Sequence, residues 1–416
     1  MSLCVRRPFA RFVAAACFLI SALALAACAG IKIPGPAPTP QAGSTVPARA
    51  GVLPQTVEPI PPAELAPPAT TAAPGKVNVA LLLPLSGPSA ALGQAMLNAA
   101  QMALFDLADD RLELLTRDTQ GSAAGAASAA QSVIAGGAQL ILGPLLQAEV
   151  EAVKPIAQAA RVPVIAFSTA TQLAGGGTYL MGFTPDQEVN RVTAYAHSKG
   201  LERFAVLAPR SAYGEIVAEA VRTAVAANAA TLVRVEFYDP TINDMAQAVR
   251  RFASQGRDFD ALFLPDGGAR LKALAPQLPY FNIDPSKVKF LGTGLWDEPG
   301  LGTEPSLDGG WYAAPAPASR AAFEKRYQEL YKTKPARLAT LGYDATALAA
   351  VLTRAPQGAD FSTATLTSPN GFAGIDGIFR LRADGLVQRG LAVLEVHRGA
   401  GTIIDPAPQS FQDLGL

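Results

Sequence analysis

The sequence predicts an α/β protein of two doubly wound lobes, each with a mostly parallel sheet covered by helices on both faces. Half of the 416 residues are hydrophobic and only 16% are charged, so the chain can bury a large core. Short apolar runs alternate with helical patterns, as expected of an open, mostly parallel sheet. This alternation occurs twice, at 77–167 and at 204–291, which indicates two similar lobes with a ligand cleft between them.

The first run of elements begins with Val77–Leu83, a nearly continuous apolar stretch typical of a parallel strand buried on both faces. A turn at Pro84–Pro88 follows, and the next segment has the apolar spacing of an amphipathic helix. The expected strands of this lobe are 77–83, 112–117, 140–142 and 164–167, and the expected helices are 93–107, 123–135 and 148–160.

The second run repeats this pattern. Its expected strands are 204–207, 232–237, 261–264 and 289–291, and its expected helices are 213–227, 245–253 and 270–275. Two later helices are expected at 321–331 and 338–352. The segments 377–381 and 391–396 flank the turn residues Asp384 and Gly385, which predicts a hairpin between them.

The N-terminus has the features of an export signal. Arg6 and Arg7 precede an apolar stretch at 12–27, which is too short to predict a membrane span. The stretch ends at Leu25–Cys28, which resembles the lipobox of bacterial lipoproteins. The resemblance implies a signal peptide at 1–27, a lipid on Cys28 and, because Ala29 follows the cysteine, sorting to the outer membrane.

A proline- and alanine-rich segment follows the lipidated cysteine. Residues 28–75 hold roughly a third of the 34 prolines, and proline disfavours both helix and sheet, so an extended linker is expected. Its limiting reach is about 140 Å as an extended chain and about 40 Å as a flexible coil. No cysteine remains in the folded part, so its stability does not depend on disulfides.

Several functional classes are disfavoured by composition and motifs. The net charge is zero and no long basic run is present, which argues against a nucleic-acid partner. The two histidines, His197 and His397, do not have ligand spacing, so no metal site is expected. No nucleophile elbow, dinucleotide fingerprint or phosphate-binding loop is present. We therefore expect neither a cofactor nor an enzyme.

Short motifs follow the predicted strands in a characteristic order. They are Leu83–Pro88 with Gly93, Arg117–Gln120, Ile141–Pro144, Pro163–Ser168 and Tyr213–Gly214. Through their order and spacing the chain resembles type 1 periplasmic binding proteins of the Leu/Ile/Val-binding kind. Four further segments look most like the lipoproteins called penicillin-binding protein activators. They are Phe167–Ser168, Leu180–Pro185, Gly292–Trp296 and Asn370–Gly374.

The resemblance implies a type 1 periplasmic binding fold at 76–400, with a central cleft and a hinge of three crossing segments. The first lobe would comprise 76–184 and 297–378, and the second lobe 185–296 and 379–400. The remaining residues, 401–416, would form a C-terminal tail.

Two positions depart from the amino-acid-binding members of this superfamily. Those proteins hold the ligand carboxylate with a hydroxyl-rich segment after the third strand, where this chain has Leu145, Leu146 and Gln147. They hold the ammonium with an acidic residue in the second lobe, where this chain has Arg270. An arginine cannot accept a hydrogen bond, so a free α-amino acid is a doubtful ligand, although the nearby Asp266 could partly substitute.

Ser86, Ser168 and Thr169 are candidates for ligand contact because they follow strands, where open α/β sheets bind ligands. Turn capping explains the same residue types equally simply. Gly87 and Gly143 would let a ligand approach the backbone, or would simply permit tight turns.

Phe183, Tyr213 and Trp296 are candidate cleft aromatics, with core packing as the alternative. Trp296 precedes Asp297 and Glu298, which favours a place at the rim of the cleft.

Two functions fit these observations. The anchor, the linker and the altered ligand positions favour a lipoprotein that regulates peptidoglycan synthesis by binding a penicillin-binding protein. The alternative is the receptor of an ABC permease, in which an amino acid, amide or related solute closes the two lobes by hinge motion.

Overall fold

The computed structural model of the chain describes residues 75–107, 110–240, 242–298, 300–397 and 400–412. The expected signal peptide, Cys28 and the linker up to residue 74 lie outside these ranges. Within them, none of the helices combines the length and the apolar character needed to cross a membrane.

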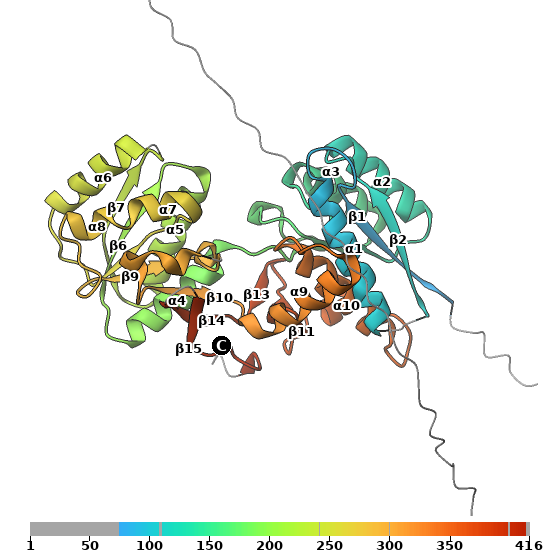
Figure 1. Cartoon of the computed structure of the whole chain (residues 1–416). Helices are drawn as coiled ribbons and strands as arrows, with labels where there is room; N and C mark the ends of the chain where they lie inside the picture. Colours follow the sequence, from blue (N-terminus) through green and yellow to red (C-terminus); the bar gives the residue numbers. More distant parts are fainter. Residues whose placement is uncertain (1–74, 108–109, 241, 299, 398–399, 413–416) are drawn as a thin grey trace, which may run out of the picture. The chain divides into compact units, whose positions relative to one another are not determined.

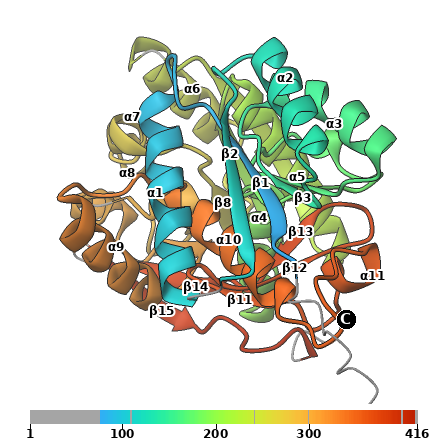
Figure 2. The ribbon, with the colours of Figure 1, turned by 90° about the vertical axis from the view of Figure 1, so that its right-hand side faces the viewer.

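The first lobe, which begins in the blue part of the chain in Figure 1, contains a parallel five-stranded sheet with the order β2-β1-β3-β4-β5. Its strands are β1 (Val77–Leu83), β2 (Leu112–Asp118), β3 (Leu140–Leu142), β4 (Val164–Ala166) and β5 (Thr178–Leu180). The helices that connect them are α1 (Ala90–Leu107), α2 (Ala123–Ala135) and α3 (Gln147–Ala160). Figure 2 shows α1 on one side of β1 and β2, with α2 and α3 on the other.

Strand β1 is apolar except at Asn78, because each of its faces lies in a separate core. Val79, Leu81 and Leu83 pack in the cluster that includes residues of α1 and of the later helix α10 (Ala339–Thr353). Ala80 and Leu82 point the other way and pack with α2 and α3. All five side chains are fully buried. The continuous apolar run therefore has the cause that the sequence suggested.

The second lobe contains a seven-stranded sheet with the order β15-β14-β10-β9-β8-β6-β7. Strands β6 to β10 run parallel, and β14 and β15 add an antiparallel pair at one edge. The strands are β6 (Arg203–Pro209), β7 (Thr231–Tyr238), β8 (Ala261–Phe263), β9 (Lys289–Gly292), β10 (Trp311–Ala314), β14 (Ala392–His397) and β15 (Ala400–Asp405).

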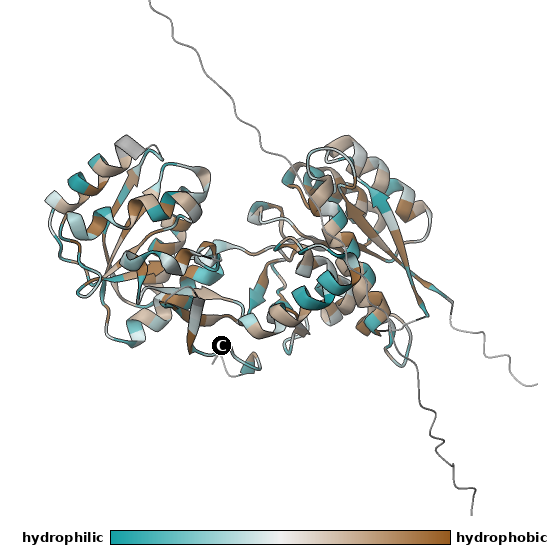
Figure 3. Ribbon diagram, viewed as in Figure 1, coloured by the Kyte–Doolittle hydropathy of each residue, from teal (hydrophilic) through white to brown (hydrophobic). Residues whose placement is uncertain are grey.

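Helices cover both faces of this sheet as well. They are α4 (Pro185–Ser198), α5 (Ala212–Ala227), α6 (Ile242–Ser254), α7 (Gly268–Leu274) and α8 (Gln277–Tyr280). On β6, Phe204 and Val206 pack with α4 and α5, and Ala205 and Leu207 face α6, α7 and α8. Figure 3 shows the hydrophobic colour concentrated on the strands, as this burial requires.

The remaining elements complete the first lobe and its connections. They are α9 (Pro317–Tyr331), α10 (Ala339–Thr353), α11 (Thr363–Leu366) and a small antiparallel sheet of β11 (Phe372–Gly374), β12 (Gly377–Leu381) and β13 (Val387–Arg389). Short 3-10 helices occupy Thr171–Leu173, Gly294–Trp296, Leu301–Thr303 and Pro305–Leu307.

The strand pairing moves two of the expected lobe boundaries. The chain returns to the first lobe after β10 and not at 296/297, because Trp311–Ala314 pairs with β9 and β14 in the second sheet. The next crossing follows β13 and not 378, because Phe379, Leu381 and Val387 are buried in the core of the first lobe.

The C-terminal part also differs from expectation. Strand Gly377–Leu381 forms its hairpin with Val387–Arg389. The expected partner at 391–396 is instead strand β14 of the second sheet. Part of the expected tail is strand β15, paired with β14. Phe411 then returns to the first lobe, where its buried ring lies 4.7 Å from the Arg380 guanidinium. Residues 406–410 thus add a further connection between the lobes.

Candidate functional site

A cavity of about 590 Å³ is lined by residues from both lobes. It collects the segments that follow the carboxyl ends of β3, β4, β5 and β6, where open α/β sheets place their ligands. Five predicted candidates line it: Gln147, Ser168, Thr169, Phe183 and Tyr213. The rest of its wall is largely apolar, with contributions from α1, α5 and the start of α10.

Some polar groups of this wall form hydrogen bonds within the protein. The Ser168 hydroxyl accepts a hydrogen bond from the Ala170 amide at 3.2 Å, so it has the capping role that the sequence left open as the alternative to ligand contact. Gln147 is exposed and donates from Nε2 to Glu151 at 2.8 Å. Thr169 is exposed beside them. Hydroxyl and amide groups therefore supply the polar contacts on this side of the cavity.

Ser86, Gly87 and Gly143 are not among the residues that line this cavity. Ser86 holds the turn after β1 together with Asp118, whose carboxylate accepts its amide at 3.2 Å. Gly143 is buried with a φ of +87°, and a Cβ there would lie 2.2 Å from the Leu82 carbonyl oxygen. Both positions have the turn role that the sequence left open as the alternative.

Asp266 and Arg270 bind each other and do not line the cavity. Asp266 is 1% exposed, accepts a hydrogen bond from the Tyr238 hydroxyl at 2.6 Å, and forms an ion pair with Arg270 at 2.9 Å. The Gly267 amide donates to the same carboxylate at 2.8 Å. Burial, and after it the hydrogen bond that the Tyr238 hydroxyl donates to Asp266, raises the pKa of Tyr238. The Asp266 carboxylate thus already has three partners within the protein.

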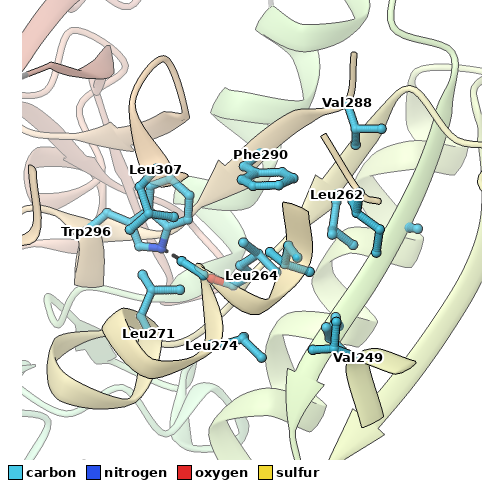
Figure 4. Packing of buried hydrophobic residues seen from close by; sticks show 14 of the residues in the cluster. Val249, Leu262, Leu264, Leu271, Leu274, Val288, Phe290, Trp296 and Leu307 are labelled. Carbon is cyan, nitrogen blue, oxygen red and sulfur yellow. Dashed lines mark hydrogen bonds between the residues drawn. The ribbon is translucent and has the colours of Figure 1, made fainter. Parts of the chain in front are cut away.

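The expectation that Trp296 lies at the cleft rim is wrong. The indole is 2% exposed and packs with Leu264, Leu271 and Leu307 in the core of the second lobe (Figure 4). Its Nε1 donates a hydrogen bond to the Leu264 carbonyl at 3.2 Å. The side chain faces the sheet, so its acidic neighbours in sequence do not indicate its exposure.

Trp296→Phe is expected to lower the free energy of unfolding by about 2 kcal/mol, because it removes a buried hydrogen bond and leaves a small cavity. Chemical denaturation of the variant measures this value. The matched control is Trp311→Phe, since Trp311 is the other tryptophan and is only partly buried. Equal losses in the two variants would contradict the core role of Trp296.

Tyr213 and Phe183 mark the passage from this cavity to a smaller one. The smaller cavity, of about 190 Å³, shares Phe183, Pro185, Tyr213 and Leu338 with the larger one. The Tyr213 hydroxyl is 2.8 Å from Thr293 Oγ1, and burial raises the pKa of Tyr213. The Phe183 ring lies between two guanidinium groups, at 4.5 Å from Arg337 and 4.4 Å from Arg389.

Glu188 is a cavity residue that the sequence did not single out. It lies in the first turn of α4, lines the smaller cavity, and accepts a hydrogen bond from the Gly294 amide at 2.8 Å. Burial raises the pKa of Glu188 to about 7, against the lowering effects of the Gly294 hydrogen bond and the Arg337 charge. Acidic residues are common in a first helical turn, so the sequence offered no signal that this one faces a cavity.

A buried ionic cluster lies behind Phe183, where the chain crosses between the lobes. Arg389 donates to the Met181 carbonyl at 2.6 Å and is 6% exposed. Arg337 pairs with the fully buried Asp376 at 3.0 Å. Asp344, also buried, accepts the Ile375 amide at 2.7 Å. Two of these four charged groups, Arg337 and Arg389, contact the Phe183 ring directly.

Two sheets of this topology, with a cavity formed by the segments after their strands, define a two-lobed binding protein of the α/β type. Residues 76–401 match the model of the periplasmic binding protein family, and the chain belongs to this family. Members of the family are typically binding proteins and not enzymes.

Relatives and solved structures are consistent with this membership. The chain is 31% identical over 147 residues to the penicillin-binding protein activator LpoA of Photobacterium profundum, covering 34% of this chain and 24% of LpoA. It is 21% identical over 221 residues to the uncharacterized protein RP748 of Rickettsia prowazekii, covering 51% and 59%. The chain thus spans less than two thirds of either relative.

Among solved structures, an ABC transporter substrate-binding protein from Sphaerobacter thermophilus superposes with a TM-score of 0.64 at 18% identity, covering 80% of this chain and 98% of that one. A solute-binding protein from R. palustris in complex with benzoate gives a TM-score of 0.56 at 20% identity, covering 81% and 97%. At these identities the likeness concerns the fold alone.

Proposed function

We propose that this chain is a non-catalytic envelope lipoprotein that regulates peptidoglycan synthesis by binding a penicillin-binding protein. The likeness to LpoA supports this role. The observation that carries it is the state of Asp266, which is the acidic group nearest the position where amino-acid receptors hold the ligand ammonium. Arg270, Tyr238 and the Gly267 amide already satisfy that carboxylate.

This arrangement argues against reception of a free α-amino acid. Binding an ammonium at Asp266 would require breaking the ion pair with Arg270 and exposing a side chain that is 1% accessible. The Arg270 side chain is 57% exposed, but the carboxylate of Asp266 already accepts three donors, so a ligand ammonium would have to displace one of them. A protein that keeps the two-lobed fold without this subsite is better suited to a macromolecular partner.

The test is crosslinking in living cells with a photoreactive amino acid at one position on each lobe. Phe105 on α1 and Tyr280 on α8 are suitable because their side chains are 81% and 79% exposed. Captured partners are detected with a fluorescent penicillin, and samples kept in the dark are the control. Recovery of a penicillin-binding protein is expected, and its absence from both positions would overturn the proposal.

Reception of a solute for an ABC permease is the second candidate function. The observation that favours it is the cavity of about 590 Å³, which is in the size range of small-molecule sites. The same experiment separates the two roles, because a receptor would be crosslinked to permease subunits.

The lipid anchor is part of the proposal, since Cys28 lies outside the described residues. Cys28→Ser should abolish incorporation of labelled palmitate and release the protein from the membrane fraction. A protein that stays in the membrane fraction without label would contradict the anchor, and fractionation of the two membranes of the native cell identifies the one that holds it.

A further inference from the structure

The smaller cavity contains a carboxylate that the protein leaves without a cation. Glu188 accepts one hydrogen bond, from Gly294 to Oε2, and Oε1 has no hydrogen-bond partner within the described part of the chain. No ion pair of Glu188 is found there either. The Glu188 side chain is part-buried, and this burial is the main cause that raises its pKa.

The other charged groups around this cavity are paired. Asp297 forms an ion pair with Arg320, and Arg337 is paired with Asp376 at 3.0 Å. Asp186, which lines the larger cavity, adds negative charge near Glu188. Within the described residues, Glu188 and Asp186 are therefore left without an ion-pair partner, and the site attracts a hydrogen-bond donor or a cation and repels an anion.

The larger cavity, which adjoins this one, offers a mostly apolar wall. Leu92, Leu146, Ile216 and Leu338 line the larger cavity, and Phe183 and Tyr213 stand between it and the smaller one. A ligand with an ammonium group against Glu188 would place its remaining atoms on this apolar wall. Burial of apolar area there would add to the affinity by about 25 cal/mol per Å².

We propose that the two cavities together bind a primary amine with an apolar body, whose ammonium group is held by Glu188 and whose body lies against Leu92, Ile216 and Leu338. Glu188 takes the place of the acidic subsite at Asp266, which Arg270 occupies. This inference goes beyond the proposed function, and failure to bind an amine would leave binding of a synthase untouched.

The experiment uses the full chain and three probes of similar shape: isopentylamine, isopentanol and 4-methylpentanoate. Titration calorimetry at pH 8 is expected to show binding of the amine, weaker binding of the alcohol and no binding of the carboxylate. In Glu188→Gln the amine affinity should fall at least tenfold, while the affinity for the alcohol is unchanged. The glutamine oxygen can still accept the Gly294 amide, so the local fold is kept.

The pH dependence gives a second readout. An alkylamine stays protonated, as lysine does, between pH 6 and 8. Glu188 titrates near pH 7, so its ionised fraction rises about tenfold over this range, and the amine affinity should rise with it. Other titratable or charged groups also face Glu188, namely Asp186, Tyr213, Asp297 and Arg337. The pH dependence of the amine affinity should nevertheless disappear when Glu188 is replaced by glutamine.

The matched control is Glu215→Gln, which removes the same charge from an exposed position on α5 and should leave amine binding unchanged. Absence of amine binding at millimolar concentration would overturn the proposal. Equal affinity in wild type and Glu188→Gln, or preference for the carboxylate probe, would overturn it as well.

Discussion

Replacement of Arg389 with methionine should lower the free energy of unfolding by about 3 kcal/mol, because the buried carboxyl groups of Asp344 and Asp376 lose a nearby positive charge. Arg389 is 6% exposed, and the carboxylates of Asp344 and Asp376 raise its pKa against the stronger lowering effect of burial. Without its guanidinium, two buried carboxyl groups would share the single charge of Arg337. The ring of Phe183 would also lose one of its two cationic neighbours.

Urea denaturation of wild type and variant measures this loss directly. Arg382→Met is the matched control, because Arg382 belongs to the neighbouring turn but its side chain is 54% exposed. The control should change stability by less than about 1 kcal/mol, as is usual for a surface ion pair. A loss at Arg389 no larger than that of the control would show that the buried cluster is not what holds the crossing segments together.

Much of the fold could be predicted because its elements follow from local patterns. The strand at Val77–Leu83 is buried on both faces, so all of its residues except Asn78 are apolar and its environment can be inferred from the sequence. The helix at Ala123–Ala135 agrees with the expected bounds, since Ser122 caps its first turn and Gly136 follows its end. Such signals lie within a few residues of the element that they define.

The lobe boundaries depend on contacts between distant segments and were therefore harder to predict. Strand β10 is only Trp311–Ala314, and a run of this length has no readable period. Its place in the second sheet is decided by pairing with Leu291 and Val393. The same holds for β13, whose partner is set by the turn at Gly385 and by burial of Val387 in the first lobe.

Cavity residues could be predicted when they directly follow a strand. The positions of residues that are fixed by long-range contacts could not be predicted. Ser168, Phe183 and Tyr213 reach the cavity because they follow the ends of β4, β5 and β6. Trp296 does not reach the larger cavity, because the carbonyl of Leu264 holds its indole in the core. Glu188 had no distinguishing signal, because its importance comes from what surrounds it in space.

Asp344→Asn should make the protein more stable at pH 8, by a few kcal/mol. Burial, and then the neighbouring Asp376 carboxylate, raise the pKa of Asp344 from its ordinary value of 3.8 to about 7. The folded state therefore holds one proton more than the unfolded state between about pH 4 and 7, and stability falls as the pH rises through this range. Each unit of difference corresponds to about 1.4 kcal/mol, and asparagine, which does not ionise, avoids this cost.

Asparagine also keeps the local contact, because its side-chain oxygen can accept the Ile375 amide in place of Oδ1. Denaturation curves at pH 5, 6, 7 and 8 should therefore show a difference between variant and wild type that grows with pH and levels off above about pH 7. The similar titration of Glu188 is present in both proteins and cancels in this difference. Asp258→Asn, at a side chain 60% exposed, provides the control without such a trend. A variant of Asp344 that is less stable than wild type at every pH would mean that the ionised carboxylate stabilises the hinge through Arg389, and that its burial is compensated in full.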